Sequence, residues 1–217
     1  MRVIAIDGPA GSGKSTVARA LAARLGLDYL DTGAMYRSVA FAALRRGIDP
    51  EDAPLVARLA AQVAIDVADT VTVDGVDATI EIRGPEVTRA VSAVAANPQV
   101  RRELRRRQQE WADTHGGGVI EGRDIGSVVF PEAELKVYLT ASDAERAGRR
   151  SKEVLDLDYD TVAADIARRD YADSSRTAAP LVVATGAVTV DTTGLSIEEV
   201  VDRVLALLPD NTAEGKR

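Results

Sequence analysis

Apolar residues recur along the chain in runs of two kinds, and the two kinds alternate from one end to the other. Short runs rich in β-branched residues predict buried parallel strands, which we expect at 3–6, 27–31, 119–121, 135–139 and 187–190. Between these runs, apolar residues spaced three or four apart predict amphipathic helices. Strands that alternate with helices in this way indicate an α/β fold with a doubly wound, five-stranded parallel sheet.

One segment departs from this alternation. Residues 64–82 carry apolar residues at every second position, and Asp74-Gly75 in their middle is a dipeptide typical of a hairpin turn. The segment predicts a small insertion of three short antiparallel strands, which is followed by a helical region at 86–113.

Polar residues at the edges of the periodic segments predict where helices begin. Thr32 is placed to cap the helix that follows the second strand, and Asp49 precedes a proline at the start of the next helix. Ser196 and Glu199 have the spacing of a capping box before the last helix.

The stretch from Gly8 to Thr16 predicts a specific chemistry. It matches the P-loop pattern G-x-x-x-x-G-K-[ST] and lies between the first strand and the first helix, which is the context the motif requires. In such a turn, backbone N–H groups and the helix dipole face an anion. Lys14 would supply a positive charge to the phosphates of ATP, and the Ser15 hydroxyl would bind Mg²⁺. The predicted ATP-binding residues are Gly8, Pro9, Ala10, Gly11, Ser12, Gly13, Lys14, Ser15 and Thr16.

Composition removes several classes of function. The 217 residues include no cysteine and one histidine, His115, which stands before three glycines and is expected at the surface, so thiol and Ser-His-Asp chemistry are disfavoured. The net charge of −7 argues against a nucleic-acid partner. No apolar run reaches the roughly 18 residues of a membrane helix. We expect a cytoplasmic protein that acts on small molecules as a monomer.

A P-loop alone does not name a reaction. The chain has no N-K-x-D run for reading guanine and no L-S-G-G-Q signature of transporter ATPases. Arginine and aspartate at predicted strand ends suit phosphoryl transfer, in which a protein chiefly positions phosphates and neutralises their charge.

Four segments together resemble the bacterial cytidylate kinases: 6–14 (IDGPAGSGK), 30–37 (LDTGAMYR), 121–126 (EGRDIG) and 176–181 (RTAAPL). The likeness extends in order over nearly the whole chain. It implies a P-loop NTPase-type fold in one kinase domain, 1–217. It also implies a nucleotide-monophosphate-binding region at 32–115, which contains the insertion. Separately, the polar and irregular sequence at 151–160 predicts a mobile flap, and we expect a short lid at 148–160.

The resemblance implies transfer of the ATP γ-phosphate to CMP or dCMP, with Mg²⁺. The predicted catalytic residues are Lys14, Arg123, Arg149 and Arg150. Of these, Arg149 and Arg150 fit the lid, where they would close over the ATP phosphates. The acceptor phosphate would meet Arg37, Arg123 and Arg176, which can bind phosphate through two N–H groups at once. The residues that it implies for CMP are Thr32, Gly33, Arg37, Ser92, Arg101, Arg123, Asp124, Arg169, Asp173 and Arg176.

Two other functions remain compatible with the sequence. One is a P-loop kinase for another small acceptor, such as UMP, shikimate or dephospho-coenzyme A, which has no use for a carboxylate that reads cytosine. The other is a nucleotide-dependent switch that hydrolyses ATP or GTP slowly without an acceptor.

Overall fold

The central sheet has five strands, all parallel, in the order β2-β6-β1-β7-β8. A computed structural model describes residues 1–153 and 159–208, so part of the expected lid (154–158) lies outside these ranges. The strands are β1 (Arg2–Asp7), β2 (Tyr29–Asp31), β6 (Gly117–Gly122), β7 (Leu135–Thr140) and β8 (Val188–Asp191). The predicted α/β fold class is therefore confirmed.

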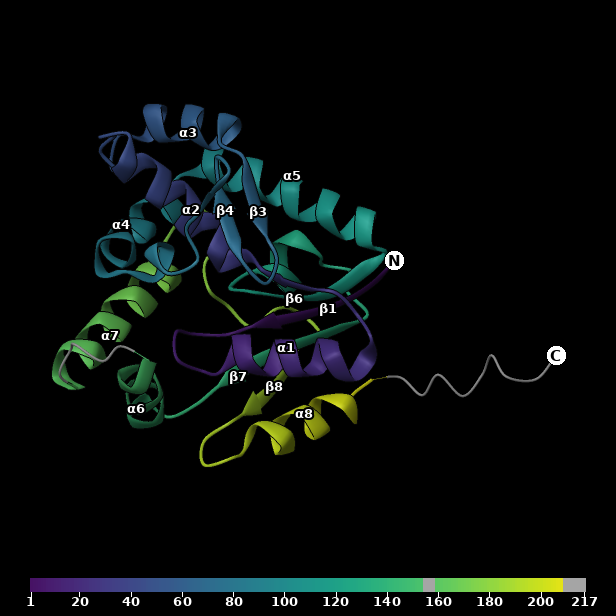
Figure 1. Cartoon of the computed structure of the whole chain (residues 1–217). Helices are drawn as coiled ribbons and strands as arrows, with labels where there is room; N and C mark the ends of the chain where they lie inside the picture. The colour runs from purple at the N-terminus through teal and green to yellow at the C-terminus, as the bar shows by residue number, and fades with distance from the viewer. Residues whose placement is uncertain (154–158, 209–217) are drawn as a thin grey trace.

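Helices cover both faces of the sheet (Figure 1). On one face lie α1 (Lys14–Leu25) and α8 (Ile197–Leu205). The other face carries α2 (Thr32–Arg45), α3 (Ala53–Gln62), α4 (Pro85–Ala96) and α5 (Pro98–His115). Alternation along β1 explains the two cores: Ile4 and Ile6 pack toward α1, whereas Val3 and Ala5 pack in the core that contains α2.

A third, smaller apolar cluster joins the two remaining long helices, α6 (Asp143–Glu153) and α7 (Tyr159–Ser175), to the P-loop. Its buried members are Ala10, Ala147, Val162 and Ile166. A short π-helix, η2 (Ile125–Val129), which the sequence did not predict, follows β6. Within residues 1–153 and 159–208, no helix is both long and apolar enough to cross a membrane.

The insertion is a three-stranded antiparallel sheet of β3 (Ile65–Val67), β4 (Val71–Val73) and β5 (Val76–Asp77). Asp74 and Gly75 both have positive φ, at 51° and 76°, as the predicted tight hairpin turn requires. The expectation that strand structure extends to residue 82 is wrong. Asp77 accepts hydrogen bonds from the backbone and hydroxyl of Thr79, which turns the chain into a 3₁₀ helix, η1 (Glu81–Arg83).

Two predicted helix starts also need correction. Thr32 does not cap α2: the Asp31 carboxylate accepts the Ala34 N–H at 2.9 Å, while the Thr32 hydroxyl donates to the Glu121 carbonyl at 2.6 Å. The helix expected at 49 begins at 53, because Asp52 accepts the Leu55 N–H at 3.0 Å. In both places a neighbouring aspartate, one residue before Thr32 and three residues after Asp49, is the residue that caps the helix.

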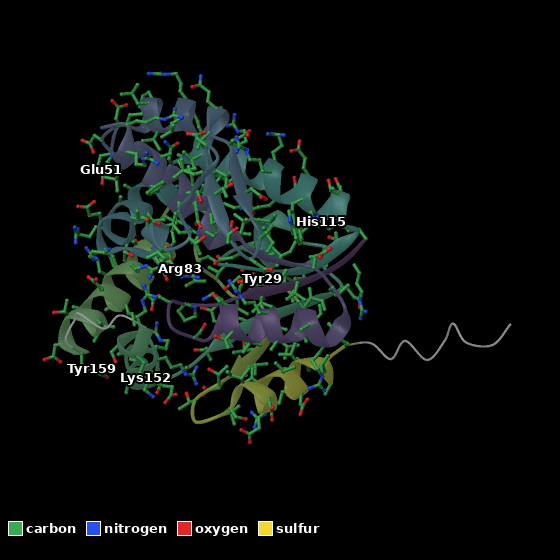
Figure 2. All side chains as sticks on the ribbon, in the orientation of Figure 1. Tyr29, Glu51, Arg83, His115, Lys152 and Tyr159 are labelled. Carbon is green, nitrogen blue, oxygen red and sulfur yellow. The ribbon has the colours of Figure 1, made fainter. Side chains whose placement is uncertain are left out.

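The capping box predicted before α8 is confirmed. Ser196 accepts from the Glu199 N–H, and the Glu199 carboxylate accepts from the Ser196 N–H. His115 is exposed at the end of α5, where its ring stacks on Trp111 with the ring centroids 4.3 Å apart (Figure 2).

Candidate active site

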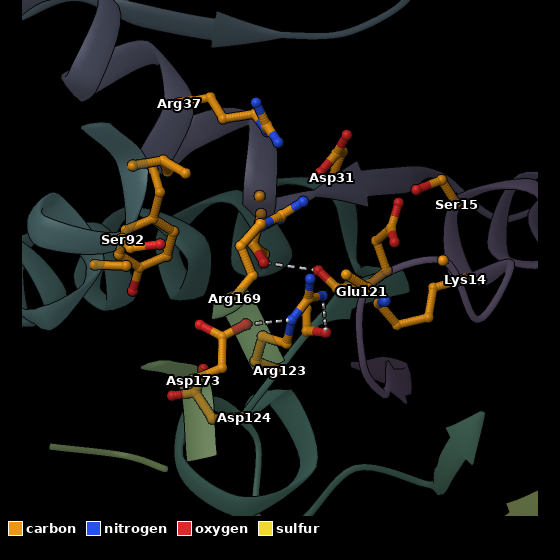
Figure 3. A pocket seen from close by; sticks show the side chains of 18 of the residues that line it. Lys14, Ser15, Asp31, Arg37, Ser92, Glu121, Arg123, Asp124, Arg169 and Asp173 are labelled. Carbon is orange, nitrogen blue, oxygen red and sulfur yellow. Dashed lines mark hydrogen bonds and ion pairs between the residues drawn. The ribbon is translucent and has the colours of Figure 1, made fainter. Parts of the chain in front are cut away.

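A cavity of about 410 Å³ opens beyond the carboxyl ends of β1, β2 and β6 (Figure 3). This is where ligands bind in doubly wound sheets, and the volume suits a small molecule. Most of the predicted substrate-binding residues line this one cavity, although they are spread over 167 positions from Ala10 to Arg176. They are Ala10, Gly11, Gly13, Lys14, Ser15, Thr16, Thr32, Gly33, Arg37, Ser92, Arg101, Arg123, Asp124, Arg150, Arg169, Asp173 and Arg176.

The P-loop is a tightly packed turn. A Cβ atom added at Gly8 would lie 2.1 Å from the Leu139 carbonyl oxygen, so only glycine fits there. The Pro9 carbonyl accepts from the Ser12 hydroxyl at 3.1 Å and from the Lys14 ammonium at 2.7 Å. Gly8, Pro9 and Ser12 do not line the cavity themselves; they set the shape of the turn that does.

Lys14 is a buried cation. Burial, together with repulsion from Arg123, lowers the pKa of Lys14 to about 7. Glu121 opposes this shift. Because the free site destabilises the charged form, an anion that approached Lys14 would restore its proton and gain a strong contact.

Oxygen ligands gather beside the P-loop lysine. Glu121 at the end of β6 is buried, and burial and the neighbouring Asp31 raise its pKa, while Tyr29 donates a hydrogen bond to it. Asp31 at the end of β2 is also paired with Arg83 at 3.1 Å. Asp31 and Glu121 belong to two of the segments that carry the family resemblance, but the sequence analysis gave neither a role. Their positions at the ends of predicted strands could have indicated that they reach the site.

This set of one hydroxyl and two carboxylates fits Mg²⁺, which prefers oxygen ligands and retains several waters. Among the residues that the structure describes, no cluster of three or more acidic, histidine or cysteine ligands occurs. The site therefore fits a metal bound jointly by protein and phosphates rather than one enclosed by protein alone.

Buried arginines face the P-loop across the cavity. Arg37 donates to the Ile82 carbonyl and to the Thr88 hydroxyl, both at 3.0 Å. Burial, with repulsion from Arg169, lowers the pKa of Arg37 to about 9. Burial, with repulsion from Arg123, lowers the pKa of Arg169 to about 10. Like charges held together away from water create a site that an anion would stabilise.

A chain of ion pairs continues from these arginines to the far end of the cavity. Asp173 accepts from Arg123 Nε at 2.9 Å and lies 3.4 Å from Arg176 Nη1. Asp124 Oδ2 accepts from Arg101 Nη2 at 2.5 Å, and its Oδ1 lies 3.7 Å from Arg176 Nη2. That Arg176 nitrogen is buried and makes no hydrogen bond among the described residues. The network holds both carboxylates and leaves one buried donor for a ligand.

The end of the cavity near Asp124 has apolar walls. Tyr36, Val91 and Ala95 line it beside Ser92, and the Arg101 guanidinium lies 5.5 Å from the centre of the Tyr36 ring. Burial raises the pKa of Tyr36 to about 12, so the ring stays neutral. Sequence reasoning gave no role to Tyr36, Val91 or Ala95, because helical periodicity marks them only as core-facing.

The two lid arginines are placed differently. Arg150 lines the cavity, as expected. Arg149 does not: it donates to the Thr192 carbonyl at 2.7 Å and hydroxyl at 2.8 Å, and to the Ser12 carbonyl at 3.4 Å. In this structure Arg149 therefore links the P-loop to Thr192, on the side of the loop that does not face the cavity. Arg83, which lines the cavity, was not predicted, since it follows an insertion with no motif of its own (Figure 2).

The chain is similar to known proteins in sequence and in fold. A family model described as cytidylate kinase matches residues 4–210. The cytidylate kinase of Desulfitobacterium hafniense is 48% identical over 220 residues, which cover 98% of this chain and 94% of that protein. The cytidylate kinase of Mycolicibacterium paratuberculosis is 48% identical over 215 residues, which cover 95% of this chain and 94% of that protein.

A solved structure of an uncharacterized protein from Eubacterium ventriosum matches the fold, with a TM-score of 0.51 and 11% identity over 95% of this chain and 97% of that one. At this identity the likeness concerns the fold alone, whereas the family match extends over nearly the whole sequence. The chain belongs to the cytidylate kinase family.

Proposed function

We propose that the protein transfers the γ-phosphoryl group of ATP to CMP or dCMP. An oxygen of the monophosphate forms a bond to the γ-phosphorus, the bond from that phosphorus to the β-phosphate oxygen breaks, and ADP and CDP or dCDP leave. The observation that supports this most directly is the single cavity in which buried arginines face the P-loop and an Asp124–Arg101 pair stands at the far end.

The donor end would be the P-loop. Its backbone N–H groups and Lys14 would hold the ATP phosphates. The negative charge of these phosphates would stabilise the protonated form of Lys14, which burial and Arg123 disfavour in the free site. Arg150, which also lines the cavity, would add a second cation near the transferred group. Arg149 would act on the donor end indirectly, because it donates to the Ser12 carbonyl and so stabilises the loop.

The acceptor phosphate would lie among Arg37, Arg123 and Arg176. Arg37 and Arg123 are held in place by neutral or acidic partners, and Arg176 has one buried nitrogen that makes no hydrogen bond within residues 1–153 and 159–208. Such fixed guanidinium groups orient an anion and lower the charge repulsion between two approaching phosphates. Thr32 and Gly33 line the cavity between the two ends.

Base selection would depend on Asp124, Arg101 and Ser92. Cytosine offers an amino donor beside a ring-nitrogen acceptor, which a carboxylate next to a guanidinium can match. Uracil has a carbonyl in place of that amino group, so it would offer Asp124 no donor, and the carboxylate would repel the carbonyl oxygen. The apolar walls made by Tyr36 and Val91 suit the faces of a flat ring.

The pentose would lie between base and phosphate, beside Arg169 and Asp173. Asp173 has two carboxylate oxygens engaged by Arg123 and Arg176, and each oxygen can accept a further hydrogen bond from a ribose hydroxyl. Because those arginines satisfy Asp173 without the hydroxyl, we expect dCMP to be accepted as well as CMP.

Mg²⁺ would be held by Ser15, with Glu121 and Asp31 bound through its waters. When bound, the ion neutralises charge on the ATP phosphates.

We assign residues 32–115 to the region that binds the monophosphate and residues 148–160 to a lid, of which 154–158 lie outside the described residues. A kinase for UMP, shikimate or dephospho-coenzyme A would share the donor end. It would not need the buried Asp124–Arg101 pair, which is the feature that favours cytosine.

The test is a coupled ADP-release assay with AMP, GMP, UMP, TMP, CMP and dCMP as acceptors. We expect turnover with CMP and dCMP to exceed all the others. Turnover with UMP or AMP that equals or exceeds that with CMP would contradict the cytosine assignment, and ADP release that no monophosphate accelerates would favour a switch protein.

A further inference from the structure

Asp170 on α7 touches the P-loop directly, although neither the motif nor the cavity includes it. One carboxylate oxygen accepts the Ala10 N–H at 3.0 Å. The other accepts a hydrogen bond from Arg146 on α6, and the same Arg146 nitrogen donates to the Ala10 carbonyl at 3.0 Å. Both main-chain polar groups of Ala10 are therefore held by an acid–base pair from the two helices.

Packing reinforces this polar contact. The Ala10 methyl group lies in the apolar cluster of Ala147 on α6 with Val162 and Ile166 on α7. At the next residue, Gly11, an added Cβ would lie 2.7 Å from the Arg146 carbonyl oxygen. The P-loop is thus packed against α6 and α7 as closely as a core element, and a shift of either helix must move the loop or break these contacts.

The same helix carries acceptor-site groups. Arg169 and Asp173 line the cavity from α7, one residue before and three residues after Asp170. Asp173 is bound to Arg123 at 2.9 Å. Since residues three or four apart are neighbours on a helix, Asp170 and Asp173 are carried on one short, stiff section of α7.

We propose that Asp170 is a positioning residue that couples occupancy of the acceptor site to affinity of the donor site. A monophosphate that engages Arg169 and Asp173 fixes the position of α7. Because Asp170 accepts the Ala10 N–H, the position of α7 then fixes the main chain of Ala10 and with it the phosphate-binding turn. The proposal rests on the proposed function, because it requires two nucleotides in one cavity.

The coupling is measured by titrating the protein with the β,γ-imido analogue of ATP and Mg²⁺ in a calorimeter, with and without saturating CMP. We expect CMP to tighten analogue binding at least about fivefold in the unaltered protein, within the usual range of coupling between sites. Asp170→Asn loses the ion pair with Arg146 and keeps only a weaker, neutral contact with the Ala10 N–H, so the factor should fall below about twofold.

Asp165→Asn is the matched control. Asp165 lies on the same helix, and its pair with Arg168 at 2.8 Å is exposed, so this variant should keep the full coupling factor. Asp170→Asn should bind CMP alone within about twofold of the unaltered protein, which a general loss of structure would not allow. If Asp170→Asn does not fold, Arg146→Gln, which removes the cation paired with Asp170, provides the same comparison, and its coupling factor should also fall below about twofold.

Full coupling in Asp170→Asn, or an unaltered protein whose two ligands bind independently, would overturn the proposal while leaving the kinase assignment intact. Failure of CMP to bind the unaltered protein at all would overturn the proposed function and this inference with it.

Discussion

Asp124→Asn is the substitution that tests base selection most sharply. The change removes one charge and keeps the shape of the side chain. Asp124 contacts Arg101 at 2.5 Å and Arg176 at 3.7 Å, and all three side chains are less than 10% exposed. The variant therefore leaves two buried guanidinium groups facing a neutral amide.

The expected effects follow from that geometry. Loss of a charge-assisted hydrogen bond to the cytosine amino group costs about 1.5–3 kcal/mol, or a ten- to 150-fold decrease in kcat/KM for CMP. The new amide N–H can donate to the uracil carbonyl, so the preference for CMP over UMP should fall about 100-fold. Breaking the buried pair should cost about 3 kcal/mol of the free energy of unfolding. That cost corresponds to a melting temperature lower by about 6–12 °C.

Steady-state ADP release with CMP and UMP measures the preference, and urea unfolding measures the stability. Asp202→Asn is the matched control, because Asp202 pairs with Arg24 at 3.4 Å where both side chains are more than half exposed. It should change neither quantity by more than about 0.5 kcal/mol. A folded Asp124→Asn protein whose CMP-to-UMP preference stays within about threefold of the unaltered value would refute the reasoning.

Three further outcomes follow from the P-loop. Lys14→Met should leave the fold intact, because Ser12 still donates to the carbonyl that Lys14 contacts, and should lower kcat about 10²–10³-fold; near-normal turnover by the folded variant would contradict the role of Lys14. Because the pKa of Lys14 is about 7 in the free site, binding of MgATP near pH 8 should take up close to one proton, and binding near pH 6 almost none; calorimetry in buffers of different ionisation enthalpy checks this, and equal uptake at both values would be inconsistent with it. Gly8→Ala should destabilise the protein by about 3 kcal/mol or more, since its Cβ would meet the Leu139 carbonyl, whereas Gly47→Ala, which has positive φ and open space, should cost about 1 kcal/mol; similar urea midpoints for the two variants would show that the close approach is unimportant.

The layers of the fold could be predicted because each depends on a local period. Alternation within β1 sends Ile4 and Val3 to opposite cores, and the positive φ of Asp74 and Gly75 makes the hairpin where the dipeptide indicated it. Helix starts were less predictable. Asp31 and Thr32 are adjacent, and only the position of Glu121 on the neighbouring strand decides which of them caps α2.

The residues of the site likewise fall into some that could be predicted from the sequence and some that could not. Residues that follow parallel strands, such as Lys14 and Arg123, could be expected at one edge of the sheet from topology alone. Arg83 and Asp170 could not, because their contacts join segments 52 and 160 positions apart and no local pattern records that proximity. Arg149 shows the reverse case: its sequence position beside Arg150 suggested a shared role, yet successive residues of a helix point in different directions.

The central claim is that one cavity holds two phosphate groups and moves a phosphoryl group between them. ATP labelled at its γ-phosphorus, incubated with the protein, Mg²⁺ and CMP, tests this directly when the products are separated. The account predicts that the label appears in CDP in equal amount to the ADP formed, and that little is released without CMP. Label recovered as inorganic phosphate at a rate independent of CMP would contradict it.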